Sequence, residues 1–240
     1  MRELSHRRTA AAIADYIEKS TDLPLWPCAV EVSDALVLRR LLEDLPLAVV
    51  KQPWSSSGRG VRYFDAARTS VDTFVGQTVG TIARQGSVMV ERFMPEHHDF
   101  ALLFQCNHGK VEYVGPSVFI SGSAAANYGG NIVAPDSHLR ALISEFIDPV
   151  QFDELTSAVA SAIEAVIAPA YDGPVGVDIC ASGGLIHICE TNLRYTMGFV
   201  ARGIATHSDI EGILTSTDRP DENDIVLTPP GVATKFVVRH

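Results

Sequence analysis

The stretch that begins at Gly173 and reads GPVGVDICASGGLIHICETNLRYTMGFVAR constrains this chain more than any other segment. Val175, Val177 and Ile179 alternate with small or polar residues, which is the period of a half-buried strand. Residues 181–184 are turn formers, and residues 185–191 read as a second strand. The segment therefore predicts a β-hairpin.

This hairpin would gather polar ligands on one face. Asp178 is expected to lie across from Glu190 or one position off it, and Asn192 to share the face of Glu190. Two carboxylates and an amide oxygen are hard ligands that suit Mg²⁺ or Mn²⁺ and would not suit zinc. Arg194 follows at the same alternation and could contact an anion that the metal also holds. The alternative is an acidic hairpin that faces water.

A second motif joins two short predicted strands, at residues 47–52 and 61–64. The loop between them, PWSSSGRGV, is not a Walker A loop, because no Gly-Lys-Ser/Thr closes it. Small residues let backbone N–H groups approach phosphate oxygens, and Lys51 and Arg59 would add charge. The alternative is a flexible hairpin tip. The candidate phosphate-binding loop residues are Ser55, Ser56, Ser57, Gly58, Arg59 and Gly60.

The remaining pattern predicts an α+β fold. Helices are predicted over residues 5–20, 33–45, 70–85, 137–147, 151–171 and 195–205, and strands over residues 88–94, 99–106, 110–120, 128–134 and 235–238. We expect Ser5 and Ser33 to cap the first two helices. Residues 207–231, rich in Asp, Pro, Thr and Ser, read as a surface connection.

Composition limits the partners. The chain has 240 residues, 46% hydrophobic, with a net charge of −10, which argues against nucleic acid or an anionic membrane as the main partner. No apolar run is long enough to span a membrane and no signal peptide is apparent, so a cytoplasmic location is expected. The four cysteines lie in apolar runs and read as buried free thiols, with Cys180 and Cys189 as possible cross-strand neighbours.

Taken together, these motifs resemble the ATP-grasp superfamily, in the same order along the chain from about residue 5 to about residue 205. VVKQPWSSSGRGV is similar to the family's lysine-bearing strand and its glycine-rich loop, and VMVERFM is similar to its hinge strand. The dipeptide Asp99-Phe100 resembles a pair in the family in which an acidic residue is followed by an aromatic one. Asp178, Glu190, Asn192 and Arg194 resemble its metal cluster and anion-binding arginine. The SSGRG loop and the E-x-N-x-R-x-T-M-G segment resemble a bacterial subgroup.

The resemblance implies a fold of two α+β subdomains that grip ATP between antiparallel sheets. The small (lid) subdomain would cover residues 1–90 with the glycine-rich loop at 53–61, and the large subdomain residues 91–240 with the metal site. Glu91 and the backbone of Arg92, Phe93 and Met94 would meet the adenine, and Asp99 would meet the ribose. Arg7 or Arg8 stands in place of a phosphate-contacting lysine. Lys51 and Arg194 would be the catalytic residues.

The implied activity is an ATP- and Mg²⁺-dependent ligase that joins a small-molecule carboxylate to an amine through an acyl phosphate. The alternatives are a nucleotide-binding module or regulatory subunit without turnover, and an ATP-grasp kinase. Members usually carry a further N-terminal α/β subdomain, which this chain is expected to lack, unless another chain supplies it; a homodimer is also possible. Five histidines, His97, His98, His108, His138 and His187, could act as bases, although a structural or exposed role is commoner for each.

Overall fold

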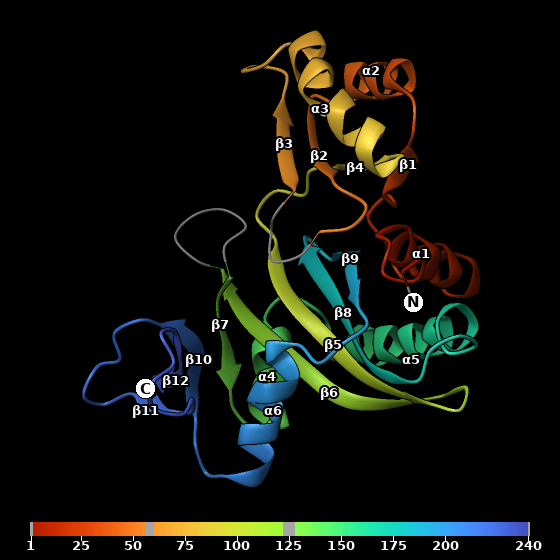
Figure 1. Ribbon diagram of the computed structural model, residues 1–240. Helices are drawn as coiled ribbons and strands as arrows, with labels where there is room; N and C mark the ends of the chain where they lie inside the picture. Colours follow the sequence, from red (N-terminus) through yellow and green to blue (C-terminus); the bar gives the residue numbers. More distant parts are fainter. Residues whose placement is uncertain (1, 56–59, 122–127, 240) are drawn as a thin grey trace.

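The structure is a computed structural model that describes residues 2–55, 60–121 and 128–239 (Figure 1). The helices are α1 (Arg8–Ser20), α2 (Ala35–Asp44), α3 (Val71–Gln85), α4 (Asp136–Ile143), α5 (Pro149–Val166) and α6 (Met197–His207). The strands are β1 (Val30–Val32), β2 (Leu47–Lys51), β3 (Val61–Asp65), β4 (Val88–Arg92), β5 (His98–Asn107), β6 (Lys110–Ser121), β7 (Tyr128–Val133), β8 (Gly173–Ser182), β9 (Leu185–Asn192), β10 (Gly212–Thr217), β11 (Ile225–Val226) and β12 (Lys235–Arg239).

A small antiparallel sheet forms the first body, with the strand order β1-β4-β2-β3. Its strands alternate, so one face carries Ala48, Val50, Val88 and Val90 into a core with α2 and α3. The other face carries Val49, Lys51, Met89 and Glu91. That second face is turned away from the two helices and toward the rest of the molecule (Figure 1).

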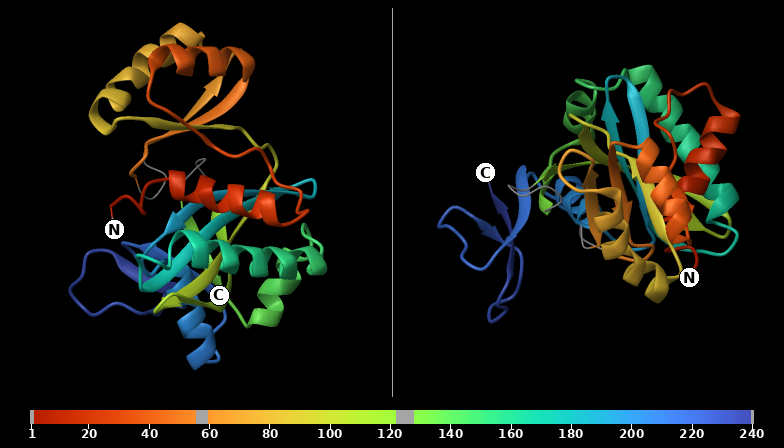
Figure 2. Two further views of the ribbon diagram at one scale, coloured as in Figure 1. Left: turned by 90° about the vertical axis from the view of Figure 1, so that its right-hand side faces the viewer. Right: turned by 90° about the horizontal axis from the view of Figure 1, so that it is seen from above.

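The second body is an eight-stranded sheet with the order β11-β12-β10-β7-β6-β5-β8-β9. The apolar residues of β5, β8 and β9 on one face pack in the main core together with α1 and α5, which lie side by side in Figure 2. A smaller core joins α6 to β7, β10 and β12. Residues 21–29 lead from α1, which packs with the large body, into β1 of the small sheet, and residues 93–97, the hinge after β4, lead back into the long strand β5 (Figure 1).

Helix α1 packs with the large body although it precedes the small one in sequence. Its buried stripe, which includes Ile13 and Ile17, contributes to the core formed with α5 and β9. The predicted small subdomain of residues 1–90 includes this helix, whereas the small sheet and its two helices span residues 30–92. The division of the chain at residue 90 stays a prediction.

Two predicted caps are wrong. The N-cap position of α1 is Arg7, whose side chain makes no cap hydrogen bond, so Ser5 lies upstream of the helix. Helix α2 is capped by Asp34 rather than Ser33. The backbone of Asp34 is extended, and its carboxylate accepts from the N–H groups of Leu36 at 2.8 Å and Val37 at 3.1 Å. A carboxylate placed directly before the first helical residue has the required reach, and the preceding serine does not.

The predicted surface connection at residues 207–231 is also wrong in part, because it contains β10 and β11. β10 pairs with β7 on one side and β12 on the other. Its sequence, GILTST, is rich in residues that also favour turns, and its burial depends on partners distant in sequence.

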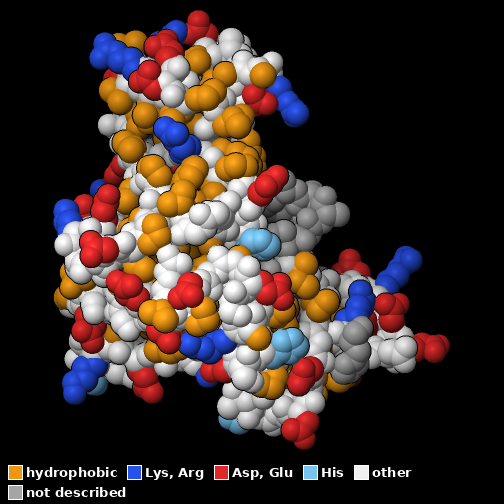
Figure 3. All heavy atoms as spheres, turned by 180° about the vertical axis from the view of Figure 1, so that it is seen from behind, with side chains coloured by type: hydrophobic (Ala, Val, Ile, Leu, Met, Phe, Trp, Pro, Cys, Tyr) orange, Lys and Arg blue, Asp and Glu red, His pale blue; other side chains and the backbone are white. Residues whose placement is uncertain are grey.

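The surface carries charge of both signs. On the face seen from behind, acidic and basic side chains are interspersed (Figure 3). Among the described residues, no helix combines the length and the apolar character needed to cross a membrane.

Candidate functional site

Three neighbouring strands of the large sheet present their polar residues on one face. The register places Asp178 of β8 opposite Glu190 of β9, as the hairpin predicted, and opposite Ala101 of β5. Directly paired residues share a face, so the register defines successive rows across the three strands. In the order β5, β8 and β9, the rows are Asp99–Cys180–His187, Ala101–Asp178–Glu190 and Leu103–Gly176–Asn192.

A β-bulge shapes this face. The register shifts after Asp178, so that Ile179 pairs with Ile188 and Cys189 is the extra residue of β9. The bulge brings the thiol of Cys189 to 3.3 Å from that of Cys180, which confirms that these cysteines are neighbours. All four cysteines are free thiols, as the sequence predicted, and Cys106 and Cys180 are buried. Cys28 and Cys189, which were also expected to be buried, are only partly so.

The predicted metal ligands form a connected group. The Asn192 amide donates to Asp178 Oδ2 at 2.9 Å, and the Asn192 oxygen accepts from Arg194 at 3.3 Å. Burial, followed by the negative charge of Glu190, raises the pKa of Asp178 to about 7. Two carboxylates in such a place repel each other, and a bound cation would relieve that repulsion. The donor set is oxygen-rich, which fits Mg²⁺ or Mn²⁺.

Arg7 connects this group to the small body. Its buried guanidinium donates from Nη1 to Glu190 Oε2, from Nε to the Gln52 carbonyl and from Nη2 to Ser55 Oγ, each at 3.0 Å. Arg8 instead pairs with Glu31 and is half exposed. Of the two arginines that the sequence left open, Arg7 therefore contacts a predicted metal ligand, and its contact with phosphate stays a prediction.

Lys51 lies across the junction in a buried ionic group. Its ammonium pairs with Glu91 Oε1, and His187 Nε2 lies 3.1 Å from Glu91 Oε2. Burial alone would raise the pKa of Glu91, but Lys51 and then His187 hold it at about 2. Burial would lower the pKa of Lys51, but the charge of Glu91 raises it on balance. The three side chains come from β2, β4 and β9, and thus from both sheets.

The hinge after β4 is held by backbone contacts. The Arg92 carbonyl accepts from the Trp26 indole at 3.1 Å, and the Phe93 N–H donates to the Leu47 carbonyl at 3.3 Å. The Met94 carbonyl lies 2.7 Å from His97 Nδ1. The predicted contacts of this segment with adenine stay a prediction.

Asp99 lies beyond the hinge in the row of Cys180 and His187. One ligand atom from each of His97, Asp99 and Cys180 lies within 4.8 Å of the other two. The Cys180 thiol also lies 3.8 Å from the sulfur of Met94. The sequence did not indicate this softer group, because its members come from the hinge, β5 and β8.

A backbone hydrogen bond closes the base of the loop between β2 and β3. The Gln52 N–H donates to the Gly60 carbonyl at 2.9 Å, and Gly60 has φ +72°, a conformation that favours glycine. Ser55 contacts Arg7, as described above. The other predicted loop residues, Ser56, Ser57, Gly58 and Arg59, lie outside the described part of the chain.

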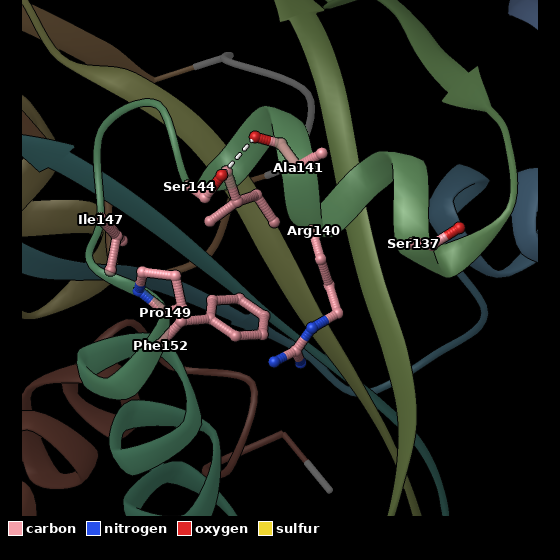
Figure 4. A pocket seen from close by; sticks show the side chains of 8 residues that line it. Ser137, Arg140, Ala141, Ser144, Ile147, Pro149 and Phe152 are labelled. Carbon is pink, nitrogen blue, oxygen red and sulfur yellow. Dashed lines mark hydrogen bonds between the residues drawn. The ribbon is translucent and has the colours of Figure 1, made fainter.

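A hollow of about 240 Å³ lies elsewhere, between α4 and the beginning of α5 (Figure 4). Arg140 stacks over the ring of Phe152 at 4.7 Å and pairs with Asp153 at 2.5 Å, so its charge is already compensated. None of the predicted site residues lines this hollow. It belongs to the surface between two helices and not to the face of β5, β8 and β9.

No protein-family profile matches the sequence. No curated protein matches it either. Solved structures do match the fold. The biotin carboxylase domain of 2-oxoglutarate carboxylase from Hydrogenobacter thermophilus has a TM-score of 0.63 and 13% identity over 98% of this chain and 62% of that chain. Biotin carboxylase from Campylobacter jejuni has a TM-score of 0.63 and 14% identity over 98% of this chain and 63% of that chain.

N5-carboxyaminoimidazole synthetase from Staphylococcus aureus is more distant in shape. Its TM-score is 0.53, with 14% identity over 85% of this chain and 46% of that chain. This chain therefore spans less than two thirds of the length of the structures that it matches. At such identities the likeness establishes the fold, and the roles of the individual site residues stay predictions.

Proposed function

Because this chain has the ATP-grasp fold, we propose that it is an ATP- and Mg²⁺-dependent ligase that joins a carboxylate to an amine. One observation carries the proposal. The oxygen-bearing residues Asp178, Glu190 and Asn192 share one face of the β8–β9 hairpin. Arg7 contacts Glu190, and Lys51 pairs with Glu91, which contacts His187 of the same hairpin. Anionic ligands next to cations at one junction suit a metal-bound polyphosphate.

The matched structures support the ligand class. The Hydrogenobacter domain was solved with MgADP and bicarbonate, and the Staphylococcus synthetase with ADP. For this chain we propose ATP as the nucleotide and Mg²⁺ or Mn²⁺ as the ion. A bound ion of this kind would neutralise charge on the phosphates during transfer.

The residues of the chain then have defined tasks. Asp178, Glu190 and Asn192 hold the ion, and Arg7 and Lys51 hold phosphate oxygens. Arg194, which is exposed beside Asn192, neutralises the acyl phosphate or the oxyanion that forms from it. Glu91 and the hinge backbone meet the adenine, and Asp99 meets the ribose. This arrangement works by positioning and charge neutralisation, which is what phosphoryl transfer requires.

The proposed reaction has two steps. An oxygen of the carboxylate attacks the γ-phosphorus, and the bond to the β-phosphate oxygen breaks, which gives an acyl phosphate and ADP. The amine nitrogen then attacks the acyl carbon, inorganic phosphate leaves, and the amine loses a proton to solvent. Bicarbonate is included among the candidate carboxylates because it is bound in a matched structure.

The test is a screen for ADP release with Mg²⁺ present. Bicarbonate, amino acids and short peptides are paired with ammonia and primary amines, and phosphate is measured in parallel. The ligase predicts ADP and phosphate in equal amounts only when a carboxylate is present. ADP without free phosphate would favour a kinase instead. Nucleotide binding with no ADP release for any pair would favour a binding module without turnover.

A further inference from the structure

His187 is a buried histidine that the proposed reaction does not use. Its side chain is 5% exposed, and Nε2 lies 3.1 Å from Glu91 Oε2. The other oxygen of Glu91 pairs with the ammonium of Lys51. One carboxylate of the small sheet is thus shared between a lysine of its own sheet and a histidine of the large sheet.

Because Glu91 contacts both Lys51 and His187, the contact with His187 affects the direction of the Lys51 ammonium. A buried carboxylate oxygen without a donor is costly, so each oxygen of Glu91 needs a partner. While His187 satisfies Oε2, Glu91 holds Lys51 through Oε1 alone. If His187 were absent, Glu91 could satisfy both oxygens by turning them onto Lys51, which would draw the ammonium away from any phosphate in the junction.

We propose that His187 is a positioning residue for Lys51, acting through Glu91. This inference rests on the proposed function, because Lys51 is taken to bind a nucleotide phosphate. By occupying one oxygen of Glu91, His187 limits the competition between that carboxylate and the phosphate for the same ammonium. It also fixes β4 against β9, so that Lys51 is held at a set distance from the β8–β9 face.

The surroundings of His187 agree with its role as the donor. The charged or titratable groups that face it are Glu91 of β4, Lys51 of β2 and Cys189 of its own strand. Burial alone would lower the pKa of His187, but the hydrogen bond with Glu91 raises it on balance. The imidazole is therefore disposed to keep a proton on the nitrogen that faces Glu91.

The experiment compares two amide substitutions. The amide nitrogen of His187→Gln reaches about as far as Nε2 and can still donate to Glu91, whereas that of His187→Asn is too short to do so. Dissociation constants for MgATP are measured by calorimetry, and thermal melting reports folding. His138→Asn, on the exposed surface of α4, is the matched control for the same chemical change.

We expect His187→Asn to weaken MgATP binding about 10-fold or more, since a hydrogen bond to a charged group is at stake. His187→Gln and the control should stay within about 3-fold of the parent. In a Glu91→Gln background, the Asn and Gln variants should bind MgATP alike. A purely structural histidine would lower the melting temperature of His187→Asn without this pattern of affinities.

The outcomes separate the two claims. If the parent binds MgATP and His187→Asn binds it equally well, the positioning role is overturned and the proposed function stands. The role is also overturned if the loss persists undiminished in the Glu91→Gln background. If the parent itself does not bind MgATP, both claims fall.

Discussion

Glu190 already binds a cation in this structure, the guanidinium of Arg7 at 3.0 Å. A carboxylate that forms an ion pair with a guanidinium in the free protein is in a position to bind a metal ion as well. Its neighbour Asp178 has a pKa raised to about 7 by burial and by the charge of Glu190, so negative charge on both carboxylates is unfavourable until a cation compensates it. We therefore expect a metal site here to require the charge of Glu190 rather than its shape.

For Glu190→Gln we predict a loss of about 100-fold or more in ADP release, because metal charge neutralisation contributes several kcal/mol to phosphoryl transfer. The change preserves size and leaves an oxygen that can still accept from Arg7, so the variant should remain folded, although the lost charge beside this buried guanidinium lowers the free energy of unfolding. Turnover and thermal melting measure the two effects. Glu154→Gln, on an exposed position of α5, is the control. Full activity in Glu190→Gln would remove Glu190 from the metal site.

The group of Lys51, Glu91 and His187 should make stability depend on pH. The pKa of Glu91 is lowered to about 2, so its contribution is present above its unfolded pKa and is lost as the pH falls toward about 2. The pKa of His187 is raised, so its contribution is present below its unfolded pKa and is lost as the pH rises through the folded value. The group therefore stabilises the protein most at mildly acidic pH.

We predict that Glu91→Gln destabilises the protein most near pH 5.5, roughly midway between the unfolded pKa values of Glu and His. The difference in unfolding free energy between parent and variant should shrink at about pH 3, which lies below the unfolded pKa of Glu, because the unfolded parent then takes up a proton at Glu91 that the folded parent, with a pKa of about 2, largely does not. Urea unfolding at the two pH values measures it, with Glu154→Gln as the control. An equal difference at both pH values would contradict the ionic account of this group.

At the scale of elements, the first turn of α2 offers a direct comparison of neighbouring residues. Asp34 accepts from two backbone N–H groups, and Ser33, one residue earlier, was the cap expected from sequence. We predict that Asp34→Ala costs about 1 kcal/mol, or roughly 2–4 °C in melting temperature for a chain of this length. Ser33→Ala should have little effect. Equal losses, measured by thermal unfolding, would mean that both residues cap the helix.

The sequence predicted those helices and strands whose residue pattern lies within one short segment. The hairpin of β8 and β9, with Asp178 opposite Glu190, was expected because apolar alternation and a Gly-Gly turn lie within about 20 consecutive residues. β10 was missed because its turn-favouring sequence becomes a strand only through pairing with β7 and β12. The bulge at Cys189 was likewise invisible in the alternation.

At the scale of the whole molecule, the resemblance predicted two α+β bodies with antiparallel sheets, and the structure and the matched folds confirm them. The contacts between the bodies were not predictable from spacing. Glu91 and His187 are 96 residues apart in sequence, and Arg7 and Glu190 are 183 apart. Such pairs depend on how the sheets are placed against each other, and no local periodicity encodes that placement.

The placement also determines what a ligand between the sheets would change. Arg7 and His187 join the two bodies. Arg7 donates to Glu190 of β9 and to Ser55 of the loop after β2, and His187 of β9 contacts Glu91 of β4. A metal-bound polyphosphate would compete with the ion pairs that Arg7 and Lys51 already form with Glu190 and Glu91. Its binding would be favourable only if the metal ion compensates the charge of Asp178 and Glu190. Nucleotide binding should therefore depend strongly on a divalent ion.

Calorimetric titration of ATP into the protein, with Mg²⁺ and with EDTA in its place, tests this central claim most directly. With Mg²⁺ we predict saturable binding with a dissociation constant of about 1 mM or lower, which corresponds to at least about 4 kcal/mol. With EDTA the affinity should fall at least about 10-fold, because the carboxylates then face the phosphates uncompensated. No binding with Mg²⁺, or equal affinity with EDTA, would contradict a metal–nucleotide site on the β8–β9 hairpin.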